Sequence, residues 1–518
     1  MARLLDYFGR RTNWQRRLWN PGTVTVLQET LEAVDLLASG HRAEAVRELA
    51  RMAQHRSGPD RGLGTSADRS ALTATLRKLQ ESPRSPIARH QLDQLLTSIT
   101  KDYLARWSRI LSSDPNALAP EAASRTLAGH LLGLGFSSDY LHRWATWLAK
   151  QRSPASLAEV FREAEEVTRR QPRRWEVLVP FIALARHSQQ MPPEWLDAGA
   201  TTQWLAQNSP TVRLRHNGGF LLQINAHDQW AAAEEAGDLI ESLAARVAVG
   251  QPGRPSFEPH SEAIIAGSAK TFPLGRPRRQ VDIHALQRQN SLFSVVEPGL
   301  TGRLRSAIDM VAPLETGAPG AVIAGGWAAL EAVLARPKAS HREIAEDFAI
   351  LVACSLPRAE LTPLAYAYIA QNDDRLSAEL IRSSSNLERC ALIGTAIKKG
   401  VPMRLRTPSD QAAVERMRGI LADPSGVLDR VVSYVNEALL RLYRQRNLVL
   451  HAGKTDSVAI SSALRTVPPL VGAGLDRLVH DALEMGYSEP LRLVARARTA
   501  IQHCGKDGGV EPWDLLGH

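Results

Sequence analysis

The spacing of hydrophobic residues along the 518-residue chain is mainly that of amphipathic helices. "GAVIAGGWAALEAVLA" and "REIAEDFAILVACSL" both repeat apolar residues every three to four positions. A longer stripe follows the breaker "ADPSG" and comprises Leu428, Val431, Val432, Val435, Leu439, Leu442 and Tyr443. No repeat of 20–50 residues is present. We therefore expect a mainly α-helical, multidomain protein.

The pattern predicts helices over residues 1–190. "TVTVLQETLEAVDLLASG" predicts a helix that ends at Gly40, because glycine is a common C-cap. "GFSSD" separates two further helices and offers a serine or an aspartate as an N-cap. We interpret 1–190 as an N-terminal region for sensing or partner binding.

The pattern changes over residues 191–290. Two short β-like runs flank Asn217-Gly218-Gly219, which favours a hairpin. A long helix follows, with Asp228 as its expected cap, and "EAIIAGSAKTFPL" predicts another strand. We expect a small α/β module here, and a helical domain over 291–518 in which a Pro-Pro pair interrupts the last long helix.

Composition narrows the class of protein. No apolar run reaches the ~20 residues that span a bilayer, and the N-terminus lacks the apolar segment of a signal peptide, so we expect a soluble, cytoplasmic protein without a membrane partner. Three widely spaced cysteines and scattered histidines lack the spacing of a metal site, and we expect no metal and no cofactor. The net charge of +9 favours polyanionic partners such as nucleic acid.

The stretch "RLYRQRNLVLHAGKTD" combines polar and apolar residues in an unusual way. Arg446 lies 18 positions, or five helical turns, after Leu428, so an unbroken helix would place it on its own apolar stripe. We expect either a helix break or a polar environment for Arg446. Asn447 and His451 are four residues apart and share a face, so the amide is placed to orient the imidazole.

The segment "LLRLYRQRNLVLHAG" resembles the signature of HEPN domains: an arginine, a polar residue, three mostly apolar residues and a histidine before a glycine turn. The resemblance covers roughly residues 300–485 and implies a helical bundle. "GGWAALEAVL" is similar to an earlier helix of the family, which implies that Glu331 is an acidic partner of Arg446. The family usually has glycine directly after the histidine, where this chain has Ala452, and we expect Gly453 to make the turn.

The resemblance implies a metal-independent endoribonuclease whose catalytic residues are Arg446, Asn447, His451 and Glu331. Many HEPN proteins dimerise to form the active cleft, which implies a homodimer or higher homo-oligomer and an RNA substrate. Large HEPN proteins often act in phage defence or as toxins, which implies a phage-derived or cognate regulatory partner. The residue chemistry agrees, because histidine exchanges protons near neutrality and arginine stabilises charge on a phosphate.

Further basic residues are candidates for contacts with nucleic acid, namely Arg444, Lys454, Arg278 and Arg279. Arginine-rich stretches at 10–17, 169–174 and 276–279 are candidate surfaces for an acidic trigger. We expect the upstream half either to hold two HEPN domains apart or to cover the cleft. Two other functions remain open: a non-catalytic HEPN dimerisation or interaction protein, and a helical DNA-binding regulator.

Overall fold

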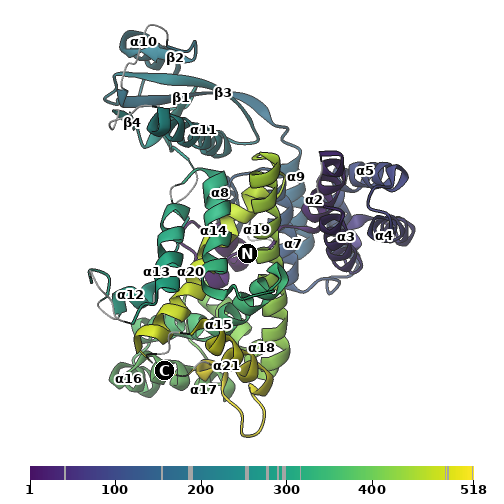
Figure 1. The fold of residues 1–518 in the computed structure, drawn as a ribbon, viewed down its shortest axis with the longest axis vertical. Helices are drawn as coiled ribbons and strands as arrows, with labels where there is room; N and C mark the ends of the chain where they lie inside the picture. The colour runs from purple at the N-terminus through teal and green to yellow at the C-terminus, as the bar shows by residue number, and fades with distance from the viewer. Residues whose placement is uncertain are drawn as a thin grey trace.

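The computed structural model describes residues 1–39, 42–152, 156–184, 191–250, 256–275, 279–288, 291–294, 299–315, 317–484, 486, 489–515 and 517. Its described residues form 21 α-helices and one six-stranded antiparallel sheet, so the prediction of a mainly helical protein is confirmed. Figure 1 shows the sheet and two helices as a module at one end of a larger helical body.

The N-terminal helical region has its own core, built from residues between Leu4 and Val167. Ser137 caps one of its helices and accepts a hydrogen bond from the backbone N–H of Tyr140, which confirms the break predicted at "GFSSD". The predicted cap Gly40 lies outside the described residues. The helices of this region are α1 (Ala2–Phe8), α2 (Thr23–Asp35), α3 (Ala43–Ser57), α4 (Ser66–Glu81), α5 (Pro86–Lys101), α6 (Tyr103–Ser113), α7 (Pro120–Gly133), α8 (Ser138–Trp147) and α9 (Leu157–Thr168).

The α/β module has a sheet of strand order β2-β3-β1-β5-β6, with β4 also paired to β1. The strands are β1 (Arg173–Leu184), β2 (Trp195–Asp197), β3 (Gly218–Ala226), β4 (Phe257–Pro259), β5 (Glu262–Ile265) and β6 (Thr271–Pro273). Helix α11 (Gln229–Gly250) packs on one face through Ala232, Ala236 and Ile240. Helix α10 (Ala198–Asn208) packs on the other face through Trp204 and Leu205. Residues 173–274 therefore enclose their own small cores.

Two predictions for this module are wrong. The longest strand, β1, lies in the region expected to be helical. Its apolar run "VLVPFIAL" is continuous, so its periodicity does not distinguish a core strand from a core helix. The hairpin at Asn217 does not form: residues 211–217 are not a strand, and β3 pairs with the distant β1 and β2 instead. The Asp228 cap of α11 is confirmed, and "EAIIAGSAKTFPL" supplies two strands, β5 and β6.

The C-terminal helices surround one large core that runs from Ala285 to Leu515. They are α12 (His284–Arg288), α13 (Gly302–Val311), α14 (Pro319–Leu334), α15 (His341–Gln371), α16 (Arg375–Arg382), α17 (Asn386–Lys398), α18 (Pro408–Ala422), α19 (Pro424–Ala452), α20 (Ile460–Glu484) and α21 (Pro490–His503). Asp423 separates α18 from α19 and caps α19 through the N–H of Gly426, as the breaker predicts.

The predicted Pro-Pro interruption is wrong, because α20 runs through Pro468 and Pro469. Both prolines are buried, so packing of the helix into the core outweighs the missing backbone N–H groups. Among the described helices, α15 alone is long and apolar enough to cross a bilayer, and 72% of its apolar window is buried within the protein, as in a core helix.

A buried ion cluster joins the N-terminal region to the C-terminal bundle. Glu29 of α2 accepts a hydrogen bond from Nε of Arg441 at 3.0 Å and pairs with Arg444 at 3.4 Å. Arg441 is 1% exposed and also donates to the side chain of Asn20 at 2.9 Å. Burial alone would raise the pKa of Glu29, but the two guanidinium groups outweigh it and lower that pKa.

We predict that Glu29→Gln destabilises the protein by about 3–5 kcal/mol, because it leaves two buried guanidinium groups without a carboxylate. Thermal unfolding monitored by circular dichroism would measure the shift. Glu415→Gln, at an exposed carboxylate of α18, is the control and should change stability by less than about 0.5 kcal/mol. Equal effects of the two substitutions would contradict a structural role for the cluster.

The ion cluster of Glu29, Arg441 and Arg444 also makes the stability of the protein depend on pH. Because the folded-state pKa of Glu29 is below its ordinary value of 4.5, its contribution is present above that value and is lost as the pH falls through the depressed pKa. The stability difference between the wild type and Glu29→Gln should therefore shrink as the pH falls below about 4.5.

Candidate functional site

The predicted site lies on the last two turns of α19. The helix does not break at Arg446 but continues to Ala452, and His451 lies in its final turn. Gly453 ends the helix with φ of 62°, a left-handed conformation that favours glycine. The expectation that Gly453 rather than Ala452 makes the turn is therefore confirmed. Figure 1 shows this end of α19 directed toward the α/β module.

Arg446 and Asn447 form a local pair. Nη1 of Arg446 donates a hydrogen bond to Oδ1 of Asn447 at 3.0 Å, and both residues are half-buried. The amide therefore orients the guanidinium, whereas it was expected to orient the imidazole. His451 is exposed, and its ring makes no hydrogen bond within the described part of the chain. The histidine is thus accessible to solvent and to a ligand.

Glu331 is not brought to Arg446. Helix α14 runs antiparallel to α19, since a Cβ at Gly320 would lie 3.2 Å from Val449 and one at Gly326 would lie 3.6 Å from Leu442. That register places Glu331 two to three turns away from Arg446, roughly 12–14 Å along the axis. No ion pair joins the two residues in the described structure.

The other predicted contacts with nucleic acid occupy different environments. Arg444 is buried against Glu29, and Arg279 is buried and donates to the carbonyl of Gly317 at 2.7 Å. Lys454 pairs with Asp456 at 3.0 Å and Glu32 at 3.4 Å. Arg278 lies outside the described residues. Arg444 and Arg279 therefore serve the interior of the protein and do not present an open cation to a phosphate.

The structure adds neighbours that the sequence analysis missed. Glu437 of α19 pairs with Arg56 of α3, and Ser457, just past the site, donates to Glu32 of α2 at 2.6 Å. The N-terminal helices therefore contact α19 along the side next to the site while leaving His451 exposed. One signal in the sequence pointed to Glu29 as a buried residue. It lies three residues after the buried Val26, so its carboxylate falls on the apolar stripe of α2.

Exposed apolar side chains flank the histidine. Leu450 is 52% exposed and Val458 is 45% exposed, one on each side of His451 in the chain. Leu450 therefore presents apolar surface in the last turn of α19, beside the exposed histidine, and Val458 presents apolar surface just before α20.

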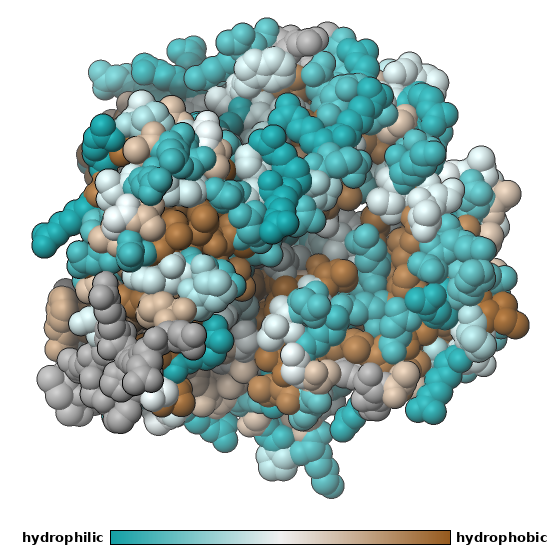
Figure 2. Space-filling model, turned by 90° about the horizontal axis from the view of Figure 1, so that it is seen from above, coloured by the Kyte–Doolittle hydropathy of each residue, from teal (hydrophilic) through white to brown (hydrophobic). Residues whose placement is uncertain are grey.

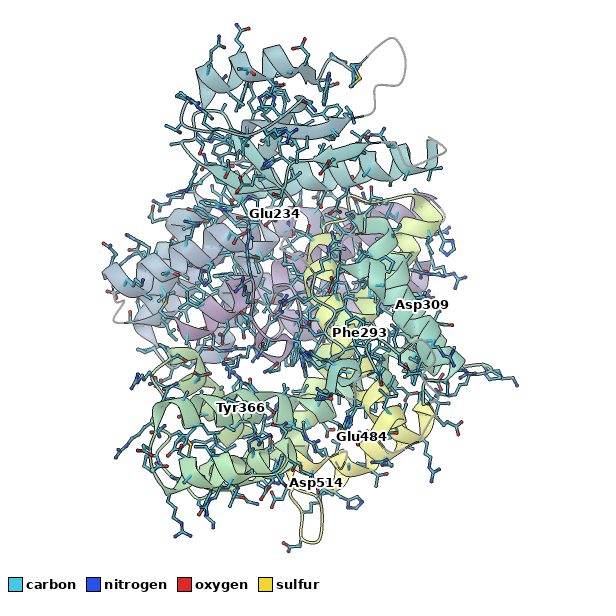
Figure 3. The ribbon with its side chains drawn as sticks, turned by 90° about the vertical axis from the view of Figure 1, so that its left-hand side faces the viewer. Glu234, Phe293, Asp309, Tyr366, Glu484 and Asp514 are labelled. Atoms are coloured by element: carbon cyan, nitrogen blue, oxygen red, sulfur yellow. The ribbon has the colours of Figure 1, made fainter. Side chains whose placement is uncertain are left out.

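A cavity of about 420 Å³ lies where the three parts of the chain meet. Its walls include α1, the start of α11 and the first turns of α20, which follows the site. Figure 3 shows Glu234, one of the wall residues, at the boundary between the α/β module and the helical body. Phe136 and His227 line the cavity, and their ring centroids are 4.4 Å apart. The described residues include no group of three or more side chains arranged to hold a metal ion.

Comparison of the chain with protein-family models, with curated proteins and with solved structures gives no match. The residues of α19 and their surroundings therefore define what chemistry the site can support.

We predict that Gly453→Ala destabilises the protein by about 1–2 kcal/mol, because alanine is strained at a φ of 62°. Gly419→Ala is the matched control: it is inside helix α18 with open space around an added Cβ, and it should be neutral or stabilising by up to about 1 kcal/mol. Urea unfolding of both variants measures the difference. Equal stability of the two variants would show that the helix ends differently.

Proposed function

We propose that this protein is a metal-independent endoribonuclease of HEPN type, with Arg446 and His451 as its catalytic residues. The observation that carries the proposal is the end of α19: a solvent-exposed histidine lies five residues after an amide-held arginine and two residues before a left-handed glycine turn. A cytoplasmic location and a role in phage defence or as a toxin accompany the family resemblance and belong to the same proposal.

The two side chains have complementary roles in RNA cleavage. Attack by a 2′-hydroxyl forms a new O–P bond to the adjacent phosphorus and breaks the bond to the 5′-oxygen of the next nucleotide. A general base accepts the proton of the 2′-hydroxyl, and a general acid donates a proton to the departing 5′-oxygen. His451 suits either role, and the guanidinium of Arg446 stabilises the charge on the phosphoryl oxygens. Asn447 would position Arg446 through the 3.0 Å hydrogen bond.

A second copy of the chain completes this chemistry. One histidine cannot act as both base and acid in a single step, whereas a symmetric dimer would bring two His451 rings to one cleft. The exposed Leu450 and Val458 support a dimer contact at this end of α19, because apolar side chains there lose contact with water on association.

The N-terminal helices are better explained as a fixed support than as a removable cover. Their buried attachment to Arg441 and Arg444 would be costly to break, and the exposed His451 supports an uncovered cleft. A fragment of residues 291–518 would lack Glu29 and leave both guanidinium groups unpaired. Full-length protein is therefore the right material for every test of activity.

We predict that His451→Ala lowers RNA cleavage by about 100-fold or more, because it removes the general acid and base. The measurement is cleavage of purified cellular RNA by full-length protein. His503→Ala is the matched control, since His503 also ends a long helix, follows an arginine by five positions and is exposed. His451→Ala that retains cleavage within a few-fold of wild type would falsify the assignment. Dimeric wild-type protein that leaves RNA intact would favour the non-catalytic HEPN alternative.

We also predict that cleavage proceeds in EDTA and yields 5′-hydroxyl ends with 2′,3′-cyclic phosphate or 3′-phosphate ends. The proposed mechanism takes its cation from Arg446 and its nucleophile from the substrate. End-labelling of the products and assays with and without magnesium measure this. Activity that disappears in EDTA and returns with magnesium would indicate a different nuclease mechanism.

A further inference from the structure

The three arginine-rich stretches of the chain differ in where the structure places them. In the first, Arg16 is buried and pairs with Glu360 at 3.0 Å, while Arg10 pairs with Asp139. In the third, Arg279 is buried and residues 276–278 lie outside the described structure. Among the described residues, the stretch at 169–174 presents four exposed arginines, whereas the first stretch presents two, Arg10 and Arg11.

A continuous surface of cations and aromatic rings surrounds this stretch, and we call it the basic–aromatic surface. It is formed by Tyr140, Arg143, Arg170, Arg173, Trp230 and Lys270, with Trp175 buried beneath Arg173. These residues come from α8, the connection between α9 and β1, the start of β1, the start of α11 and the turn between β5 and β6. Four sequence-distant segments of two structural regions therefore build one surface, since the connection after α9 runs directly into β1.

The rings and cations of this surface are in direct contact. Trp230 lies at its centre, with the guanidinium carbon of Arg143 and the amine of Lys270 each 4.9 Å from its ring. Tyr140 lies 6.4 Å from Trp230 and has Arg170 at 5.5 Å from its ring. The faces of these rings attract the cations electrostatically and keep them beside the aromatic side chains.

The remaining part of the surface adjoins the first at the end of β3. The carbonyl of Arg170 contacts Nδ1 of His227 at 2.9 Å. His227 follows Ala226, which pairs with Arg173 across the sheet. Arg173 stacks on Trp175 with its guanidinium carbon 3.6 Å from the ring.

The described part of the chain offers no carboxylate that pairs with the cations of this surface. Arg143, Arg170, Arg173 and Lys270 are exposed, and none has a carboxylate within 4.0 Å in the described structure. Neighbouring Arg169, by contrast, pairs with Glu165 and Glu166. Four such cations in one area repel one another, so the surface favours an anionic ligand. Figure 2, which views the molecule from the end with the α/β module, shows mainly hydrophilic side chains with smaller hydrophobic patches between them.

We propose that the basic–aromatic surface binds single-stranded nucleic acid. Exposed guanidinium and ammonium groups attract the phosphates, while ring faces and guanidinium planes offer stacking positions for unpaired bases. An acidic protein would pair with the cations but would not need the aromatic rings. A duplex would offer phosphates but hides the faces of its bases. Both therefore fit this surface less well than a single strand does. The proposal extends the proposed ribonuclease function by assigning a surface for RNA capture, but binding at this surface does not depend on cleavage at His451.

The test measures binding separately from cleavage. Full-length protein carrying His451→Ala is titrated, in EDTA, into fluorescein-labelled 20-nucleotide oligouridine, and anisotropy gives the Kd as a function of salt. Into this background we introduce Arg170→Ala, Arg173→Ala and Lys270→Ala together. The control removes three exposed arginines that pair with carboxylates elsewhere, namely Arg375, Arg418 and Arg430, and it causes the same change in net charge.

We expect the triple substitution in the surface to weaken binding at least 10-fold and to reduce the magnitude of the salt slope by about 2, at roughly 0.7 per phosphate contact. The control should change the Kd less than two-fold. Circular dichroism confirms that both variants fold. Arg170→Lys with Arg173→Lys should keep most of the salt slope but lose affinity, because lysine retains the charge without the stacking plane.

Several outcomes would overturn the proposal. These are no binding by the parent protein, equal effects of the two triple variants, or tighter binding of 20-base-pair RNA or of polyglutamate than of oligouridine. A matched oligothymidine distinguishes RNA from DNA as the source of the strand. Cleavage assays on the same surface variant with His451 intact are independent: loss of binding there should raise KM while kcat is retained, and absence of all cleavage would count only against the ribonuclease function.

Discussion

The attachment of α2 to α19 through Glu29, Arg441 and Arg444 is the interaction on which the arrangement of the molecule depends. It places one carboxylate between two guanidinium groups where water is excluded, so either partner alone would be very unfavourable. The N-terminal and C-terminal helical cores are therefore coupled. The helix that carries Arg446 and His451 is held along one side, and its final turn remains accessible to solvent.

Arginines in this protein divide into two populations. One population is buried or paired and holds elements together: Arg16 joins the N-terminal segment to Glu360, and Arg441 joins α19 to α2. The other is exposed and has no carboxylate partner among the residues that the structure describes, as with Arg143 and Arg173. The first population stabilises the fold, and the second remains available for a polyanion. The excess of arginine in the composition therefore does not by itself indicate nucleic-acid binding.

The proposed catalytic end and the basic–aromatic surface belong to different parts of the chain. The α/β module contributes most of the basic–aromatic surface, and the end of α19 is directed toward that module. The cavity of about 420 Å³ lies at the same junction, between the start of α20 and the start of α11. Under the two proposals, the module would capture a ligand for a site whose side chains come from the helical bundle.

Periodicity and capping chemistry determined the helices, because these are local properties. The stripe from Leu428 to Leu442, the caps at Ser137 and Asp228, and the turn at Gly453 were all readable from neighbouring residues. The Arg446–His451 motif was likewise visible as spacing. Tertiary structure alone decided the features that depend on distant partners. Strand β1 forms because β3 and β5 pair with it. Helix α20 passes through two prolines because the helix is packed into the core. Arg444 is buried because it pairs with Glu29, which is more than 400 residues away in sequence. Local sequence patterns do not encode such pairings, because the residues that surround each of these side chains are distant in sequence and come together only in the fold.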